Sequence, residues 1–209
     1  AKVNNDPDDT DRYRLTDDDR AIIGKTTPVC SGGFGINATW KGFDLNAFFN
    51  FMLDFDVLNL NKINLGLSPS SSGDYRNNSA DFKNMWRRYD DLGNDLINRP
   101  DELAAYNAGA TIWSNANLTK SFVSTYGVED GSFLRLQTVT LGYTLPKNIL
   151  KYVGMTKCRF YVTGYNLLTW TNYSGYDPEV NIGQGTTPNI DYNLYPRSRT
   201  YTFGVQLAF

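Results

Sequence analysis

The last stretch of the chain, residues 199–209, alternates strictly between two kinds of side chain. The even positions from 200 to 208 are polar or small, whereas the odd positions are aromatic or aliphatic: Tyr201, Phe203, Val205, Leu207 and Phe209. Such period-2 alternation predicts a β-strand with one apolar face. Its length fits the roughly 9–11 residues that a tilted strand needs to cross a bilayer. A soluble β-sandwich could contain the same strand, so the rest of the chain must decide.

A longer alternating segment covers residues 34–57 and is interrupted only by Lys41 and Gly42. A two-residue hairpin loop at this dipeptide pairs Trp40 with Phe43, and it leaves the alternating apolar residues of both strands on one face. The second strand then covers residues 43–57, about 15 residues, which is far above the usual five or six of globular strands. Its opposite face carries a row of polar side chains: Asp44, Asn46, Asn50, Asp54 and Asp56.

The remaining pattern is less regular. Residues 58–117 are rich in Asn, Ser, Asp and Gly, and short helices are expected within 80–89 and at 100–106. Two less regular strands are expected between 82 and 127. Alternation returns at 132–145, and Pro146 ends that strand. One or two helical turns at 147–154, a strand at 157–169 and a loop at 171–198 precede the final strand.

Four tyrosines of the loop at 171–198 are candidates for substrate binding, because aromatic faces stack on sugar rings and on peptide side chains. They are Tyr173, Tyr176, Tyr192 and Tyr195. The alternative role for these side chains is structural, as anchors of the loop or as part of an interfacial aromatic girdle. Asp177 and Glu179 in the same loop could form the carboxylate pair of a glycosidase. No second feature supports hydrolysis, and we expect no enzyme.

Composition removes several classes of function. The net charge of −2 gives no basic footprint for nucleic acid, and the absence of histidine excludes Ser-His-Asp and Cys-His catalysis. Cys30 and Cys158 show no metal spacing, so neither a metal nor another cofactor is expected. No run approaches the roughly 18 apolar residues of a transmembrane helix, but the strands of a transmembrane barrel only alternate and escape that test. The first residues do not resemble a signal peptide, and we expect a fragment or a processed chain.

Several motifs in order resemble a known family. They are residues 129–143 (EDGSFLRLQTVTLGY), 165–169 (YNLLT), 174–179 (SGYDPE) and 195–204 (YPRSRTYTFG), together with glycine-rich and hairpin residues within 23–45. This set resembles the C-terminal part of the SusC/RagA-type TonB-dependent outer-membrane transporters of Bacteroidota, over residues 20–209 with the middle loop unassigned.

The resemblance implies an all-β fold, a transmembrane antiparallel barrel segment with long extracellular loops and short periplasmic turns. The family barrel has about 22 strands around a plug. Residues 1–209 would form its C-terminal portion and supply about the last seven strands, without plug, TonB box or N-terminal strands. Seven strands cannot close such a barrel, so this piece is expected to complete one with a further segment. The polar row from Asp44 to Asp56 would then face the lumen, where it would contact the plug or line a solute path, with plug contacts favoured.

The resemblance also implies orientation and function. Phe209 would lie at the periplasmic rim. The odd-numbered residues of the last strand, which end in Phe209, resemble the C-terminal signal for barrel assembly. Residues 58–80 and 171–198 would be extracellular, and Cys30 and Cys158 would lie at opposite rims, too far apart for a disulfide. The implied function is import of glycan oligosaccharides or oligopeptides by a barrel embedded in outer-membrane lipid. A SusD-like surface lipoprotein would act as its lid, and TonB would act through the plug. The alternatives are a soluble β-sandwich that binds carbohydrate and a passive porin or adhesin barrel.

Overall fold

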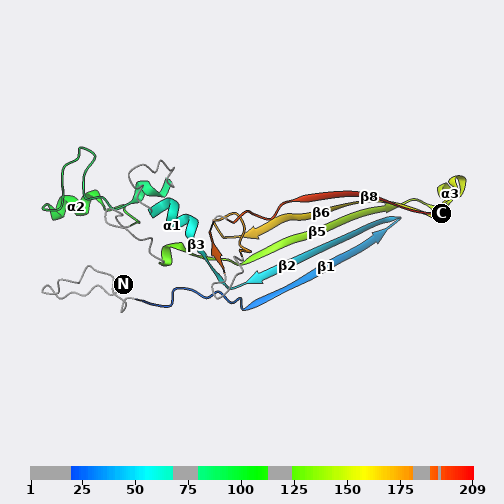
Figure 1. The fold of residues 1–209 in the computed structure, drawn as a ribbon, viewed down its shortest axis with the longest axis horizontal. Coiled ribbons are helices and arrows are strands. Elements are labelled where there is room, and N and C mark those ends of the chain that lie inside the picture. Colours follow the sequence, from blue (N-terminus) through cyan, green and yellow to red (C-terminus); the bar gives the residue numbers. More distant parts are fainter. Residues whose placement is uncertain (1–19, 68–79, 113–123, 181–188, 193) are drawn as a thin grey trace.

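The main element of the computed structural model is a long antiparallel sheet (Figure 1). The structure describes residues 20–67, 80–112, 124–180, 189–192 and 194–209. The sheet contains β1 (Cys30–Trp40), β2 (Phe43–Leu53), β5 (Phe133–Thr144), β6 (Lys157–Thr171) and β8 (Thr200–Ala208). These strands lie in the order β1-β2-β5-β6-β8, so each pairs with the next sheet strand along the chain. The predicted strands at 34–40, 132–145, 157–169 and 199–209 are thereby confirmed.

The hairpin between β1 and β2 has the predicted register. Trp40 lies opposite Phe43 and Phe34 opposite Phe49, whose rings stack with centroids 4.9 Å apart. Lys41 and Gly42 both have positive φ, 46° and 91°, as a two-residue turn that follows the twist of the strands requires. Glycine adopts such a conformation without steric cost, which explains its place at this turn.

The strand predicted at 43–57 is wrong beyond Leu53. Asp54 has a φ of 61° and ends β2, and the chain then enters a second, three-stranded sheet. This sheet contains β3 (Asp56–Asn59), β4 (Val128–Asp130) and β7 (Ile190–Asp191) in the order β4-β3-β7. Phe55 and Val57 are buried with Phe133, Tyr173 and Val180 in a small core. The alternation therefore continues through a change of sheet, and its last apolar residues pack against protein.

The two strands predicted between 82 and 127 do not lie between β2 and β5 in this sheet, because β2 pairs directly with β5 over residues 43–52. Residues 113–123 of that range lie outside the described residues. The described residues between them instead contain α1 (Leu60–Leu67), the single turns η2 (Ala80–Asn84) and η3 (Thr125–Gly127), and α2 (Pro100–Tyr106). The helix at 100–106 is confirmed. The sheet thus has five described strands where the sequence predicts about seven for the whole chain.

The connections between the long strands gather at two opposite ends (Figure 1). One end, which we call the turn end, holds the Lys41–Gly42 turn, the C-terminus and the predicted helical turns at α3 (Lys147–Leu150) and η4 (Lys151–Val153). The other, the loop end, holds β3, β7, α1 and α2. Cys30 begins β1 at the loop end and Cys158 lies in β6 near the turn end, and both are free. Among the described residues, no helix combines the length and hydrophobicity needed to span a membrane.

Candidate functional site: the polar face of the sheet and its loop anchor

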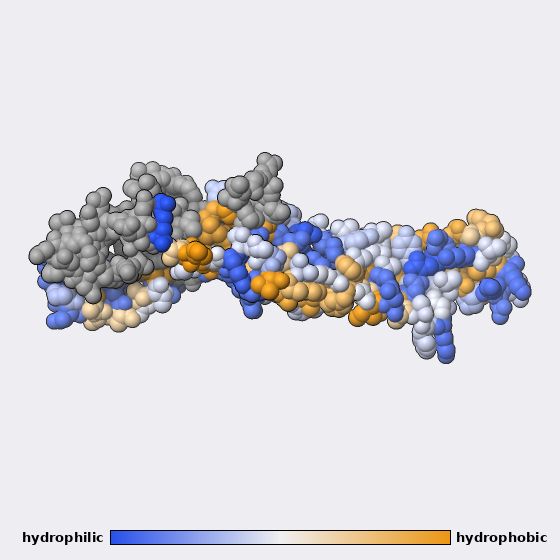
Figure 2. Space-filling view, turned by 90° about the horizontal axis from the view of Figure 1, so that it is seen from below, coloured by the Kyte–Doolittle hydropathy of each residue, from blue (hydrophilic) through white to orange (hydrophobic). Residues whose placement is uncertain are grey.

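The five-stranded sheet has one apolar and one polar face, as the residues paired across its strands show. One row across all five strands is Ala38, Leu45, Leu141, Val162 and Phe203. The next row, on the other face, is Asn37, Asn46, Thr140, Thr163 and Thr202. In the view from the β1 side, hydrophobic and hydrophilic bands run next to each other along the strand half (Figure 2). The apolar face is exposed along its length in this chain, with Phe203 80% accessible.

The polar face is held together by contacts between strands. Arg159 of β6 donates from Nε to Asp44 Oδ1 of β2 at 2.9 Å, and its Nη2 binds the other carboxylate oxygen. This ion pair passes over β5, which lies between the two strands. Asn46 Nδ2 donates to Asn37 Oδ1, and the hydroxyls of Thr140 and Thr163 are 2.9 Å apart.

The ion pair between Asp44 and Arg159 requires a glycine beneath it. A Cβ on Gly142 would lie 2.5 Å from Asp44 Oδ1 and from Arg159 Nη2. We therefore expect Gly142→Ala to separate the two charges and to lower the free energy of unfolding by roughly 1–3 kcal/mol, as overpacking commonly does. Urea unfolding in detergent or vesicles measures this, with Gly154→Ala as the comparison because no atom lies within 4 Å of its Cβ position. Since Gly154 has a φ of 68°, the free energy of unfolding lost in Gly154→Ala reports backbone strain alone. The expectation would be contradicted if Gly142→Ala lost no more free energy of unfolding than Gly154→Ala.

Two of the five predicted polar-face residues lie elsewhere. Asp44, Asn46 and Asn50 share the polar face of β2, as the register shows. Asp54 instead forms an ion pair with Lys25 Nζ at 2.6 Å, and Asp56 Oδ2 accepts the backbone N–H of Lys25 at 2.8 Å. Both carboxylates follow the break at the end of β2, so they hold the segment before β1 in place at the loop end.

A buried arginine of β5 anchors the loop that follows β6. Arg135 is only 2% exposed, and both its Nη atoms donate to the two carboxylate oxygens of Asp177. Asp177 also accepts the backbone N–H groups of Glu179 at 3.0 Å and of Arg197 at 3.4 Å. Arg197 Nη2 in turn donates to Glu179 Oε1 at 2.6 Å. We call this set of four residues the loop anchor.

The loop anchor joins two of the sequence motifs, 129–143 and 174–179, across 42 residues of chain. Burial by itself would raise the pKa of Asp177, but the hydrogen bonds from Arg135 and from the backbone hold that pKa below its usual value. A carboxylate whose pKa is lowered and whose oxygens already accept these hydrogen bonds is poorly suited to serve as a general acid. The glycosidase alternative for Asp177 and Glu179 therefore has no support in this geometry.

A second contact set fixes the start of the same loop. Glu129 of β4 accepts from Lys62 Nζ at 3.0 Å and from both the backbone N–H and the hydroxyl of Ser174 at 2.9 Å. Burial opposes the charge of Glu129, but these donors outweigh it and lower its pKa. Sequence patterns did not single out Glu129, Arg135 or Arg159. The available signal was a lone charge, such as Arg135, inside a strand of otherwise alternating apolar residues.

The four candidate tyrosines do not form one group. Tyr173 is 6% exposed, and its hydroxyl donates to the buried Asp191 at 2.6 Å. Burial, followed by that hydrogen bond to a carboxylate, raises its pKa. Tyr173 is therefore a core residue of the loop end, which corrects its assignment as a substrate contact. Tyr176, Tyr192 and Tyr195 are exposed, between 57% and 90%.

The strands of this sheet are 9–15 residues long, and they carry one continuous apolar face and one hydrogen-bonded polar face. These are features of the wall of a transmembrane antiparallel β-barrel.

Comparison with known proteins gives the family. No family model matches the chain. It is 34% identical over 197 residues to the TonB-dependent receptor P3 of Formosa agariphila, a match that covers 91% of this chain and 17% of that protein. It is 38% identical over 91 residues to the TonB-dependent receptor SusC of Bacteroides thetaiotaomicron, covering 42% of this chain and 8% of that protein. The open-open structure of the RagAB peptide importer matches with a TM-score of 0.64 and 28% identity, over 88% of this chain and 17% of that chain.

The chain thus belongs with the SusC/RagA-type TonB-dependent receptors, which are outer-membrane proteins. The similar proteins are receptors and transporters, not enzymes. The chain spans about one sixth of their length, 17% for the first of them.

Proposed function

We propose that this chain is the C-terminal wall portion of an outer-membrane TonB-dependent importer of the SusC type. The proposal rests on the sheet, which has one apolar and one polar face in a chain of this family. The apolar face suits contact with lipid, and the polar face suits a water-filled lumen. In the proposed arrangement Asp44, Asn46 and Asn50 face the lumen, where they contact the plug or line the solute path. The free edges of β1 and β8 pair with strands from the rest of the barrel, since an unpaired edge in lipid is costly.

The loop end is proposed to be extracellular and the turn end periplasmic. The loop anchor then fixes the extracellular loop against the wall, in a position where a SusD-like lipoprotein can close over it as a lid. Tyr176, Tyr192 and Tyr195 project from this end, and their exposed rings can stack on a bound oligomer. TonB supplies energy through the plug. The odd-numbered residues of β8, ending in Phe209, are proposed to serve as the barrel-assembly signal.

The substrate is proposed to be an oligomer, either a glycan oligosaccharide or an oligopeptide. Exposed tyrosines serve both, and the RagAB structure that this chain resembles is described as a peptide importer. A passive porin or adhesin barrel could have the same wall. Energy dependence separates that alternative from an importer, because only the importer needs TonB.

Uptake by whole cells tests this function. We expect cells with the complete transporter to accumulate one fluorescent oligomer class, oligosaccharide or oligopeptide, and accumulation to fall to the deletion background when a protonophore removes the proton gradient. Deleting the lid lipoprotein alone should lower uptake at low substrate concentration. Uptake that persists without the proton gradient identifies a passive barrel. A folded chain that stays monomeric without detergent would contradict the transporter and favour a soluble sandwich.

A further inference from the structure

The turn end carries a concentration of unpaired positive charge. Lys41, Lys147, Lys151 and Lys157 are all exposed there, and within the described part of the chain none of them forms an ion pair. Asp44, near the start of β2 at this end, is occupied by Arg159. The loop end differs, because its basic side chains are largely neutralised. Examples are the pairs of Lys62 with Glu129, Arg88 with Asp95, and Arg99 with Glu102.

The helical connection at the turn end places lysines beside apolar side chains. Lys147 and Lys151 are four residues apart and therefore lie on the same side of the α3–η4 segment. Ile149 and Tyr152 are exposed in the same segment, Tyr152 to 93%. Leu150 is buried and ties the segment to the sheet. Lysine next to exposed aromatic and aliphatic residues is the composition of a segment that lies at a membrane interface.

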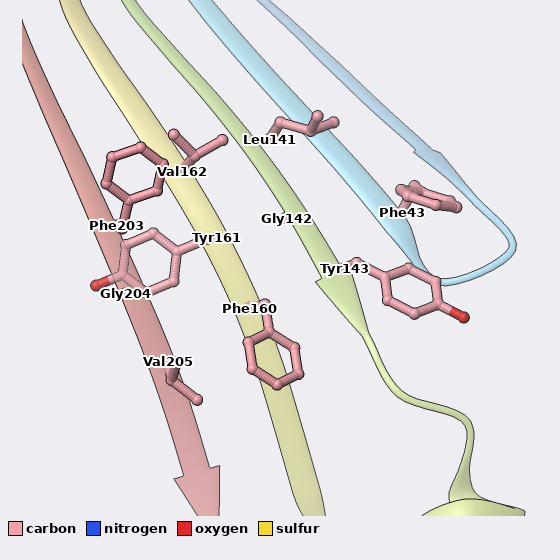
Figure 3. A pocket seen from close by; sticks show the side chains of 10 residues that line it. All are labelled: Phe43, Leu141, Gly142, Tyr143, Phe160, Tyr161, Val162, Phe203, Gly204 and Val205. Atoms are coloured by element: carbon pink, nitrogen blue, oxygen red, sulfur yellow. The ribbon is translucent and has the colours of Figure 1, made fainter.

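A hollow of about 490 Å³ lies close to this end on the apolar face of the sheet (Figure 3). Its walls come from four neighbouring strands, β2, β5, β6 and β8, and include the side chains of Phe43, Tyr143, Phe160, Val162, Phe203 and Val205. In Figure 3, β5 passes Tyr143 and continues to the helix at the lower edge of the view. The hollow is open and mostly apolar, which suits a hydrocarbon chain.

We propose that the turn end binds an anionic phospholipid, with its phosphate headgroup at Lys147 and Lys151, supported by Lys41, and an acyl chain in the hollow of β2, β5, β6 and β8. This inference rests on the proposed placement of the apolar face in lipid. The occupant follows from charge: unpaired ammonium groups select a headgroup with net negative charge over a zwitterionic one. Trp40 reinforces the site as an interfacial anchor, with Lys41 Nζ 5.1 Å from its ring centroid.

Native mass spectrometry of the complete transporter tests this site. The detergent-purified protein is exposed to equimolar phosphatidylglycerol and phosphatidylethanolamine, and the retained lipids are counted. We expect phosphatidylglycerol to be retained in excess, and the double variant Lys147→Gln/Lys151→Gln to lower that preference by about fivefold for each lysine removed. Lys83→Gln, at the loop end, removes the same charge and should leave the preference unchanged. Val162→Trp, which fills the hollow without altering charge, should reduce retention of both lipids.

Equal retention of the two lipids by the unsubstituted protein would overturn the proposal, as would a preference that survives the double lysine substitution. The preference should also weaken with rising salt, because exposed charges are screened. Outer-membrane insertion and oligomer uptake are measured on the same variants. Normal insertion and uptake without a lipid preference would overturn the lipid site alone, whereas failure of the unsubstituted protein to insert would overturn the proposed function.

Discussion

Replacement of Phe203 by arginine is expected to prevent stable insertion of the barrel. Phe203 lies near the middle of β8 on the apolar face, beside Val162. A charged side chain facing lipid at the bilayer midplane costs about 2–4 kcal/mol, and the variant also loses the transfer of a phenyl ring into lipid. The measurement is the folding free energy in lipid vesicles by urea titration, with the heat-modifiable folded band in outer-membrane fractions as the cellular readout.

Two further variants make this test specific to lipid. Thr202 is the preceding residue on the polar face, so Thr202→Arg introduces the same charge towards the proposed lumen and should insert nearly normally. Leu207→Arg lies on the apolar face near the turn end, where an interfacial charge costs only about 0–1 kcal/mol. In a soluble sandwich, Phe203 and Leu207 would both be core residues with similar losses. A loss for Leu207→Arg as large as that for Phe203→Arg would therefore contradict a lipid-facing wall.

Alternation predicted the sheet well because each residue of these strands faces one of two environments. The pairing of Trp40 with Phe43 followed from a turn of two residues and from the requirement that apolar side chains share a face. The same rule failed after Leu53. Phe55 and Val57 continue the alternation, yet a positive φ at Asp54 directs them into a protein core. Alternation records which side is apolar, but not whether lipid or protein covers it.

Local patterns could not reveal the loop anchor either. Arg135, Asp177 and Arg197 are far apart in sequence, and they meet only because β5 and β6 pair and the loop returns over the sheet. The tyrosines show the same limit. Tyr173 and Tyr176 are three residues apart and equally aromatic, but one is buried against Asp191 and the other is exposed. The family motifs located the right segments, while the role of each residue depended on long-range packing.

Replacement of Arg135 by methionine is expected to release the loop anchor. The substitution keeps volume but leaves Asp177 as a largely buried charge without its partner, which costs about 3–5 kcal/mol locally. The backbone amides of Glu179 and Arg197, which donate to that carboxylate, should lose protection against hydrogen exchange in the complete transporter, and oligomer uptake should fall. Arg87→Met is the matched control, because the pair of Arg87 with Asp91 is exposed and contributes at most about 1 kcal/mol.

Two measurements separate charge from packing at this anchor. The double variant Arg135→Met/Asp177→Leu removes both charges and should recover part of the lost stability, because an apolar pair of similar volume can replace a buried ion pair. The amides of Glu179 and Arg197 lose their acceptor in this variant and should stay unprotected. The pKa of Asp177 is lowered in the fold, so its contribution is fully present above the unfolded pKa of about 3.9 and disappears as pH falls through the lower folded value. Protection of the Glu179 amide should thus fall in acid in the unsubstituted protein, whereas in the double variant it should be low at every pH. Unchanged hydrogen-exchange protection of the Glu179 amide in Arg135→Met would show that the loop is held by its apolar core alone, with Tyr173 and Val180 as its main contacts.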